Sequence, residues 1–178
     1  MTSANVYIGT SLDGFIARTD GGIDWLMKFA DADAIESYNE FMADIDVIVI
    51  GRGTFETVLG FPSWPYDKPV FVLSSSVKKL PDSLSEKATI TSLEPPDLLR
   101  HLSDQDFKAA YIDGGKVIQS FLAADLIDTL IIATIPVLIG SGIPLFGSLD
   151  TDINFEHVRT STYPNGLVRS YYKRKREN

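Results

Sequence analysis

The sequence has no cysteine, few histidines and no long apolar run, and each absence removes a class of protein. Without cysteine, the 178-residue chain forms no disulfide, thiolate zinc site, thiol nucleophile or iron–sulfur cluster. His101 and His157 stand alone in the sequence, which is typical of surface residues and predicts no metal site. The longest apolar stretch, Leu130–Ile139, contains Thr134 and Pro136 and is too short to span a bilayer.

Length and composition are those of an ordinary globular domain. The chain is 44% hydrophobic and 22% charged, and its length suits one hydrophobic core. Met1–Thr10 lacks a basic segment followed by an apolar core, so it predicts no signal peptide and, with the missing cysteines, a soluble cytoplasmic protein. Because no repeat or linker divides the chain, we predict a single domain over residues 1–178.

Negative charge dominates and is unevenly distributed. The net charge is −8, and the first fifty residues carry nine acidic side chains against Arg18 and Lys28 alone. The basic run Lys173–Arg176 at the other end is more typical of a solvated chain end than of a DNA contact, because an acidic protein repels phosphates. We therefore expect neither nucleic-acid nor membrane partners. A site for a phosphorylated cofactor has to be built locally, from backbone amides and a few cations.

Short β-branched runs alternate with segments of helical period, which predicts an α/β domain. The expected strands have near-continuous apolar runs, as strands do when helices cover both faces. They are Val6–Thr10, Asp46–Ile50, Val70–Leu73, Ala109–Asp113 and Thr129–Ile135.

Three helices are expected between these strands. The first has Ile35, Tyr38, Phe41 and Met42 on one face, with Asp33 as cap and Glu36 as its partner in the first turn; the second follows Pro95-Pro96; the third carries Val117, Ile118, Phe121 and Leu122.

The last part of the chain predicts a hairpin. Tyr163-Pro164-Asn165-Gly166 is a tight-turn signal between expected strands at Phe155–Thr162 and Leu167–Lys173. The fold class is thus a three-layer αβα sandwich with a mixed, mostly parallel sheet that ends in antiparallel strands.

Two strand–glycine–helix turns carry a cation each. Gly51-Arg52-Gly53-Thr54 follows the buried run Val47–Ile50, and Gly114-Gly115-Lys116 follows Ala110–Asp113. Glycines let a ligand approach the backbone, and a helix start offers free N–H groups and a positive dipole end to an anion. Neither turn matches the G-x-G-x-x-G fingerprint or a Walker A loop. Two such turns favour a molecule with phosphates at more than one place, a dinucleotide, although a tight turn without a ligand also explains the first.

A serine-rich segment, Ser74-Ser75-Ser76, follows the strand Val70–Leu73. Its hydroxyls and amides could hold the adenosine-ribose phosphate that distinguishes NADPH from NADH. A serine turn that hydrogen-bonds to its own backbone is an equally good interpretation.

Taken in order, the motifs resemble a known family. They are TSLDGFIA at Thr10–Ala17, IDW at Ile23–Trp25, GRGTFE at Gly51–Glu56, VLSSS at Val72–Ser76, and YIDGGKVIQSFL with LIDTLIIATIPVLIGSGIPLF. The chain resembles the dihydrofolate-reductase fold, in the branch that includes the reductase domain of bacterial riboflavin biosynthesis (RibD C-terminal-like). The resemblance implies an activity like that of a 5-amino-6-(5-phosphoribosylamino)uracil reductase.

The resemblance implies NADPH, bound along the ends of the central strands by residues from each motif. The implied cofactor residues are Gly9 and Ile16 at the nicotinamide; Gly51, Arg52, Gly53 and Thr54 at the pyrophosphate and the adenosine phosphate; Leu73, Ser74 and Ser75 on the adenosine side; and Gly114, Gly115, Lys116 and Val117 at the other phosphate. The bound cofactor would supply the hydride. A homodimer is implied in the same way.

The chain departs from folate reductases at the catalytic carboxylate. The corresponding position in the first long helix falls near Ala34 or Ile35, and we interpret Asp33 and Glu36 as lying on different sides of that helix. This disfavours folate reduction and leaves two other candidate catalytic carboxylates, Asp13 and Asp24. Turn formation for Asp13 and loop solvation for Asp24 are the structural alternatives.

Three aromatic residues are the candidate substrate contacts: Trp25, Trp64 and Tyr66. Prolines flank the last two and could present them to a flat heterocycle, although packing over the sheet edge explains them equally well. The expected function is an NADPH-dependent reductase that delivers a hydride to a pyrimidine- or pterin-like small molecule. The alternative is a nucleotide-binding protein of the same fold without the chemistry.

Overall fold

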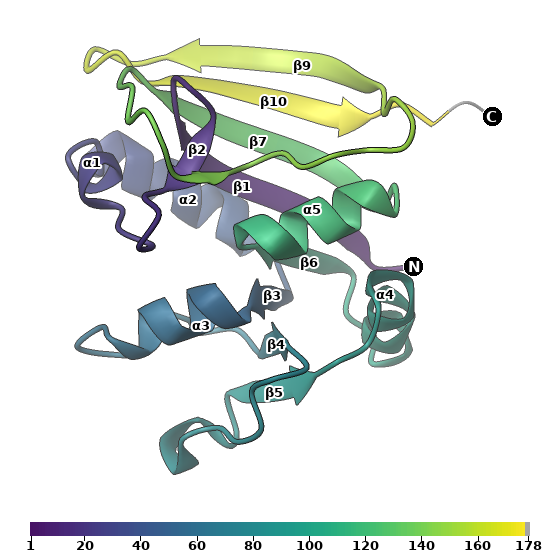
Figure 1. The fold of residues 1–178 in the computed structure, drawn as a ribbon. Helices are drawn as coiled ribbons and strands as arrows, with labels where there is room; N and C mark the ends of the chain where they lie inside the picture. The colour runs from purple at the N-terminus through teal and green to yellow at the C-terminus, as the bar shows by residue number, and fades with distance from the viewer. Residues whose placement is uncertain (177–178) are drawn as a thin grey trace.

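The computed structural model describes residues 1–176 and builds them around one eight-stranded sheet. The strand order is β5-β4-β3-β6-β1-β7-β10-β9, which Figure 1 shows from β5 at the bottom to β9 at the top. The strands are β1 Ser3–Ser11, β2 Phe15–Ala17, β3 Val47–Gly51, β4 Val70–Leu73, β5 Ala88–Thr91, β6 Ala109–Asp113, β7 Ile127–Ile135, β8 Ile143–Pro144, β9 Phe155–Thr162 and β10 Val168–Arg174. The helices are α1 Asp24–Met27, α2 Ala32–Ala43, α3 Arg52–Leu59, α4 Pro95–Asp104 and α5 Gly115–Ala123, with a short 3-10 turn at Asp82–Leu84.

The first six strands of that order are parallel, and the last two are antiparallel. β10 pairs antiparallel with β7 and with β9, while β2 and β8 form a separate two-stranded pair. The predicted mixed, mostly parallel sheet with an antiparallel end is therefore confirmed.

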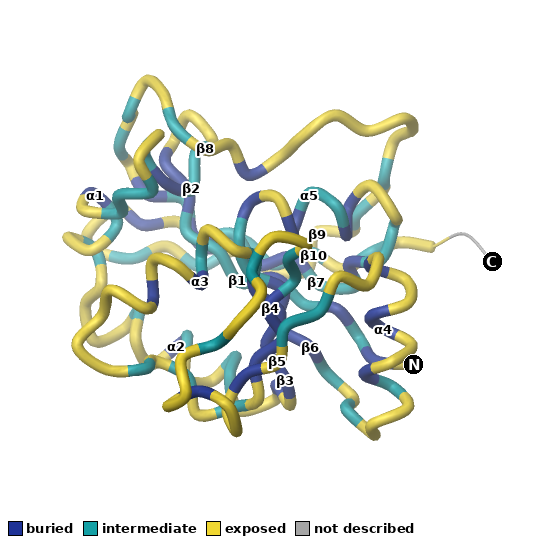
Figure 2. Tube along the Cα trace, turned by 60° about the horizontal axis from the view of Figure 1, so that its bottom comes forward, coloured by how far each residue is buried: buried dark blue, intermediate teal, exposed yellow. Residues whose placement is uncertain are grey.

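Alternate residues of the central strands bury themselves on opposite faces of the sheet, as the pleat requires. Ile48 and Ile50 of β3 pack with Phe55 of α3 and with Tyr38, Phe41 and Met42 of α2. Ile35, which was predicted on the same helix face, is exposed. Val47 and Val49 of the same strand pack on the other face with α4 and α5. Figure 2 shows the resulting buried centre along β3, β4 and β6. The near-continuous apolar runs thus reflect helices on both faces, as predicted.

The structure confirms most predicted elements and adds short ones. Three strands have the predicted bounds, Val70–Leu73, Ala109–Asp113 and Phe155–Thr162, and the helix after Pro95 buries Leu98, Leu99 and Leu102 as expected. The edge strand β5 and the pair β2–β8 were not predicted. These segments are two to four residues long, which is too short for a period of apolar residues to show.

The predicted cap of α2 is wrong by two residues. The helix begins at Ala32, and the side chain of Asp31 accepts a hydrogen bond from the backbone N–H of Ala34 at 3.0 Å. Asp33 lies inside the first turn, where its charge favours the helix dipole instead. Both aspartates match the composition of a cap, so the local sequence alone does not decide between them.

The C-terminal hairpin closes at the predicted turn. The backbone N–H of Tyr163 donates to the carbonyl of Leu167, and Gly166 alone adopts the positive φ, +87°. Asn165 instead accepts from the backbone N–H of Leu167 and donates to Asp31 at 2.8 Å, which ties the hairpin to the start of α2. Among residues 1–176, no helix is long and apolar enough to cross a membrane.

Candidate functional site

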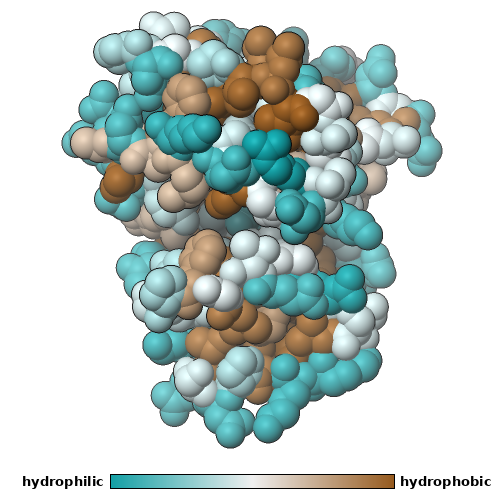
Figure 3. Space-filling model, turned by 60° about the vertical axis from the view of Figure 1, so that its left-hand side comes forward, coloured by the Kyte–Doolittle hydropathy of each residue, from teal (hydrophilic) through white to brown (hydrophobic). Residues whose placement is uncertain are grey.

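The carboxyl ends of β3, β4 and β6 lie side by side at one edge of the sheet. Gly51 of β3 pairs with Leu73 of β4, and Ile50 pairs with Asp113 of β6. Both predicted glycine turns are therefore neighbours, and α3 and α5 begin directly after them. Figure 3 looks at this end of the molecule, where α1, β2 and α3 lie, and shows hydrophobic and hydrophilic surface side by side.

The two turns also touch each other. A Cβ atom on Gly114 would lie 2.6 Å from the Thr54 hydroxyl, and one on Gly51 would lie 2.9 Å from a methyl group of Val117. Because each glycine lacks a side chain, it leaves room for a side chain of the other turn. Motifs that are about sixty residues apart in the sequence thus pack against each other at the sheet edge.

Within the two turns, Gly114 is the glycine that tolerates replacement least. Its φ is +94°, which disfavours any L side chain, and the added Cβ would meet Thr54. Gly114→Ala should therefore lower the free energy of unfolding by about 2–4 kcal/mol in urea titration. Gly53→Ala is the matched control, because a Cβ there meets nothing within 4 Å. Equal losses in the two variants would contradict this account.

Each of the two helices presents a cation at its first turn. The guanidinium of Arg52 lies 3.7 Å from the Glu56 carboxylate and 3.4 Å from the Ser76 hydroxyl, on the exposed surface. Lys116 is exposed and forms no ion pair with any residue from 1 to 176. Neither helix start has a side-chain cap, so its first backbone N–H groups are free for an anion.

The serine segment after β4 organises itself and also reaches the first glycine turn. The Ser74 hydroxyl accepts from the backbone N–H groups of Ser76 and Val77 at 3.2 and 3.1 Å. This is the predicted serine turn, yet its Ser76 hydroxyl faces Arg52. All three motifs that were proposed for the cofactor thus meet at one edge.

The residues expected at the nicotinamide lie over the same edge. A Cβ on Gly115 would lie 3.0 Å from the terminal methyl of Ile16, so β2 rests against the start of α5. A Cβ on Gly9 would lie 2.7 Å from a methyl group of Leu26, which covers this part of β1.

Asp113 is the residue that sequence reasoning missed. It ends β6, and its carboxylate accepts a hydrogen bond from the Gly114 N–H at 2.8 Å. Burial raises the pKa of this carboxyl to about 6, even though the Gly114 N–H opposes the rise. The available signal was an acidic residue between a buried strand and a glycine pair, at the strand end where ligands bind open α/β sheets.

The charge of the Asp113 carboxyl acts on three tyrosines, Tyr38, Tyr66 and Tyr111. Burial, and secondly the Asp113 charge, raise the pKa of Tyr38 to about 12 and those of Tyr66 and Tyr111 further. A neutral hydroxyl is therefore the stable form of each tyrosine. The arrangement combines an acid that titrates near neutrality with flat aromatic surface, and both are suited to a heterocycle that takes up a proton.

The raised pKa of Asp113 makes stability depend on pH in a defined direction. The folded protein holds the Asp113 proton more tightly than the unfolded chain does. The protonated carboxyl therefore adds to the free energy of unfolding in full below pH 3.8, and this contribution is lost as the pH rises through about 6. The difference between the two pKa values, 3.8 and about 6, corresponds to a change of roughly 3 kcal/mol in the free energy of unfolding. This figure is an upper bound, because Asp113 keeps some exposed surface. Asp113→Asn should therefore gain stability relative to wild type between about pH 4 and pH 7.5 in urea unfolding. A difference that does not change with pH would contradict the assignment.

The two carboxylates predicted as catalytic have structural partners. Asp13 accepts from the Ser11 hydroxyl at 2.6 Å and from the Gly140 N–H at 2.8 Å, and these bonds, the serine first, lower its pKa. Asp24 forms a two-pronged ion pair with Arg18 at 2.6 and 3.0 Å, which lowers its pKa. The contacts favour the turn and loop alternatives for both residues.

Of the three aromatic residues that were predicted to contact the substrate, two pack within the protein and one lies near Asp113. Trp25 is 3% exposed and packs with Ala133, Ile135 and Leu167. Trp64 packs edge-on against Phe55 and Tyr66, with ring centroids 6.3 and 5.3 Å away, as in the predicted packing alternative. Tyr66 alone is also close enough for the Asp113 charge to affect its pKa.

The interpretation that Asp33 and Glu36 lie on different sides of α2 is wrong. Both line one cavity, together with Ser37 and Glu40, and face the C-terminal hairpin. Residues three and four apart share a helix face, so this stripe follows from the helical period once the start of α2 is correct.

Comparisons with known proteins agree with this architecture. The family model of the RibD C-terminal domain matches residues 4–169. The uncharacterized protein YwjB of Bacillus subtilis (strain 168) is 34% identical over 172 residues, which cover 94% of this chain and 96% of YwjB. The crystal structure of a "Putative riboflavin biosynthesis protein" from Shewanella sp. PV-4 is 37% identical, covers 98% of this chain and 100% of its own, and has a TM-score of 0.92.

A more distant structure shares the fold. It is the diaminohydroxyphosphoribosylaminopyrimidine deaminase/5-amino-6-(5-phosphoribosylamino)uracil reductase of Thermotoga maritima, with 15% identity, a TM-score of 0.77, and coverage of 98% of this chain and 57% of that one. At this identity the likeness shows the fold alone. The family model, which spans nearly the whole chain, shows the family: this protein belongs to the RibD C-terminal domain family.

Proposed function

We propose that this protein is an NADPH-dependent reductase that transfers a hydride to a C=N or C=O bond of a pyrimidine- or pterin-like molecule. The observation that carries the proposal is the meeting of two uncapped helix starts, each with an exposed cation, at one edge of the sheet. Two anion sites in contact suit a dinucleotide, whose phosphates are separated along one molecule. When bound, the cofactor would supply the hydride.

The residues at this edge fit such a cofactor. Gly53 faces open space, since a Cβ there would meet nothing within 4 Å, and Lys116 forms no ion pair within the described chain. A lysine in the first turn of a helix opposes the helix dipole unless an anion sits there. We assign Arg52, Gly53 and Thr54 to the pyrophosphate and the adenosine phosphate.

The remaining cofactor contacts follow from neighbouring elements. Leu73, Ser74 and Ser75 would line the adenosine side, because Leu73 pairs with Gly51 and the serine turn faces Arg52. Ile16, which rests against Gly115, and Gly9 on β1 would face the nicotinamide side.

Asp113 is our proposed proton donor, in preference to Asp13 and Asp24. A carboxyl whose pKa is about 6 is partly protonated near neutral pH, whereas those of Asp13 and Asp24 are lowered. Asp113 would give its proton to a nitrogen or oxygen of the substrate as the hydride arrives. Tyr38 and Tyr66 would provide the walls for the ring, and the role of Trp64 would be to support Tyr66.

Titration with NADPH tests the proposal directly. Excitation of the two tryptophans, Trp25 and Trp64, should produce nicotinamide emission that saturates, with tighter binding of NADPH than of NADH. Oxidation of NADPH at 340 nm is then followed with a panel of pterins, pyrimidines and quinones. Tight binding without turnover across the panel would favour the alternative, a nucleotide-binding protein without the chemistry. Absence of saturable binding would contradict both.

The assembly is proposed as a homodimer, on family resemblance. Sedimentation equilibrium of the full chain tests it, and a monomeric mass at all concentrations would contradict it.

A further inference from the structure

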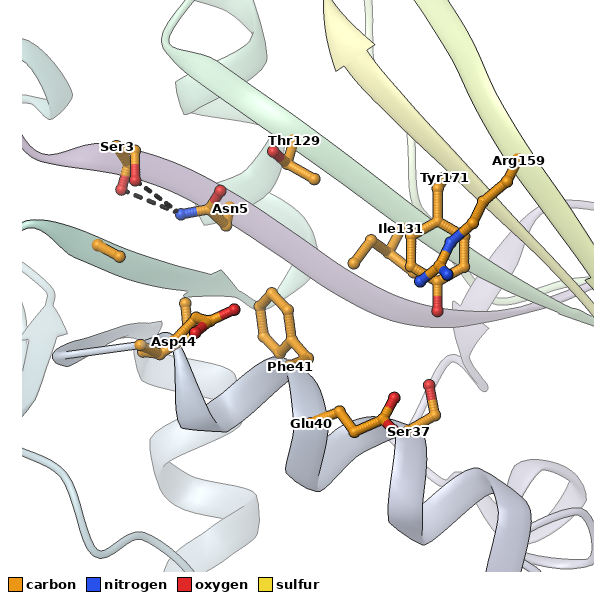
Figure 4. Close-up of a pocket in the computed structure, with 12 residues that line it drawn as sticks. Ser3, Asn5, Ser37, Glu40, Phe41, Asp44, Thr129, Ile131, Arg159 and Tyr171 are labelled. Atoms are coloured by element: carbon orange, nitrogen blue, oxygen red, sulfur yellow. Dashed lines mark hydrogen bonds between the residues drawn. The ribbon is translucent and has the colours of Figure 1, made fainter.

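A groove separates α2 from the C-terminal hairpin, away from the cofactor edge. Two adjoining cavities of about 470 and 230 Å³ share four lining residues, Ser37, Glu40, Arg159 and Tyr171. Figure 4 shows Arg159 and Tyr171 extending into this space opposite Ser37 and Glu40. The combined volume is in the range of small-molecule sites.

The two arginines of this groove differ from the others in the chain. The sequence has seven arginines, all within residues 1–176. Five of them, Arg18, Arg52, Arg100, Arg174 and Arg176, lie within 4.0 Å of a carboxylate. Arg159 and Arg169 form no such pair with any described residue, and both line the smaller cavity. Two guanidinium groups that form no ion pair are thus gathered in one place.

Arg169 is the stronger of the two indications that the groove binds an anion, because its side chain is buried. It is 1% exposed, its Nε has no hydrogen-bond partner, and its one hydrogen bond is donated to the Tyr163 hydroxyl. The rings of Tyr163 and Tyr7 lie 4.7 and 5.6 Å from its central carbon. Aromatic faces offset part of the lost hydration, but they carry no net negative charge. A buried charge without a counter-ion is strongly unfavourable.

Arg159 adds an accessible cation next to it. It is exposed, and its guanidinium stacks over the Tyr171 ring at 4.0 Å, which fixes the side chain over the groove. Arg159 and Ser161 are two residues apart on β9, so their side chains lie on one face of the sheet. On the neighbouring strand β10, Tyr171 is paired with Arg159, and Arg169 is paired with Ser161. The hairpin therefore builds a basic wall with a hydroxyl group on it.

The opposite wall is acidic. Asp33, Glu36 and Glu40 line the same cavity from α2, and none of them comes within 4.0 Å of either arginine. A ligand that bridges the groove needs an oxyanion for the arginines and N–H donors for the carboxylates.

We propose that this groove binds a small molecule that carries an oxyanion, a phosphate or a carboxylate, together with an amino group. The oxyanion is held at Arg169 and Arg159, and the amino group faces Glu36 and Glu40. The site is separate from the proposed cofactor edge and does not depend on the reductase activity.

The test follows the arginine side chains themselves. In protein labelled with ¹⁵N-arginine, the Nε–H resonances are recorded during titration with phosphoethanolamine, inorganic phosphate, β-alanine and acetate. The Arg169 and Arg159 signals should move and saturate with phosphoethanolamine or β-alanine, whichever oxyanion the site prefers. They should do so at lower concentration than with the matching anion that lacks the amino group. The resonances of Arg100, which pairs with Asp97 on α4, should stay in place.

Variants separate the site from non-specific anion binding. Arg159→Gln, at an exposed position, should weaken the preferred probe by about ten- to a hundredfold, because it removes one charge-assisted contact. Arg100→Gln should leave its affinity unchanged. Glu36→Gln should remove the advantage of the amino-bearing probe. If no probe moves the Arg169 resonance, or if the shifts are equal in Arg159→Gln and Arg100→Gln, the proposal is wrong.

Discussion

Asp113→Asn is expected to lower the kcat of the reductase by about 10²–10⁴-fold, the usual contribution of a positioned general acid. The asparagine keeps the shape of the side chain and its acceptor for the Gly114 N–H, but it has no proton to give. In the wild type, kcat should fall as the pH rises through about 6, because the carboxyl loses its proton there. The residual activity of the variant should lack this titration.

Asp46→Asn is the matched control for this prediction. Asp46 also accepts backbone N–H groups, those of Lys108 and Ala109 at 2.7 and 2.9 Å, but it does so at the opposite end of β6. Its loss should reduce stability and leave the pH profile of kcat in place. A wild-type profile in Asp113→Asn would exclude Asp113 as the proton donor.

Arg52→Ala and Lys116→Ala should each weaken NADPH binding by about ten- to a hundredfold, as expected for the loss of one charged contact to a phosphate. Neither change should affect folding, because both side chains are exposed and neither belongs to the core. The dissociation constant from fluorescence titration and the melting temperature are measured on the same samples.

Arg100→Ala controls for the loss of a positive charge elsewhere on the surface. It removes an exposed ion pair with Asp97 on α4 and should leave the affinity for NADPH unchanged. Parallel losses of affinity and melting temperature in Arg52→Ala and Lys116→Ala would support a structural role for these cations. Affinities equal to the wild type would remove both turns from the cofactor site.

The sequence predicts the sheet and the two glycine turns because these features depend on local pattern. Buried runs such as Val47–Ile50 and Val70–Leu73 mark strands that are covered on both faces, and the glycines after Ile50 and Asp113 mark the turns. Parallel pairing then places the strand ends at one edge, as the structure shows for Gly51 and Leu73.

Features that depend on distant contacts are not predictable in this way. Asp113 looks like an ordinary strand end until the fold buries its carboxyl near Tyr111 of the same strand and Tyr38 and Tyr66 of two other segments. The lack of a counter-ion for Arg169 likewise appears only when β10 pairs with β7 and α2 covers the neighbouring strands. Where two acids stand close together, as at Asp31 and Asp33, the cap is decided by the helix start and not by residue type.

A crystal structure of the protein with NADPH tests the central claim most directly. The account predicts density along the carboxyl ends of β3 and β6, with phosphate oxygens within hydrogen-bond distance of the first N–H groups of α3 and α5 and of Arg52 and Lys116. The nicotinamide should lie on the side of Asp113. A nucleotide bound in the groove between α2 and the hairpin, with the sheet edge empty, would contradict the account.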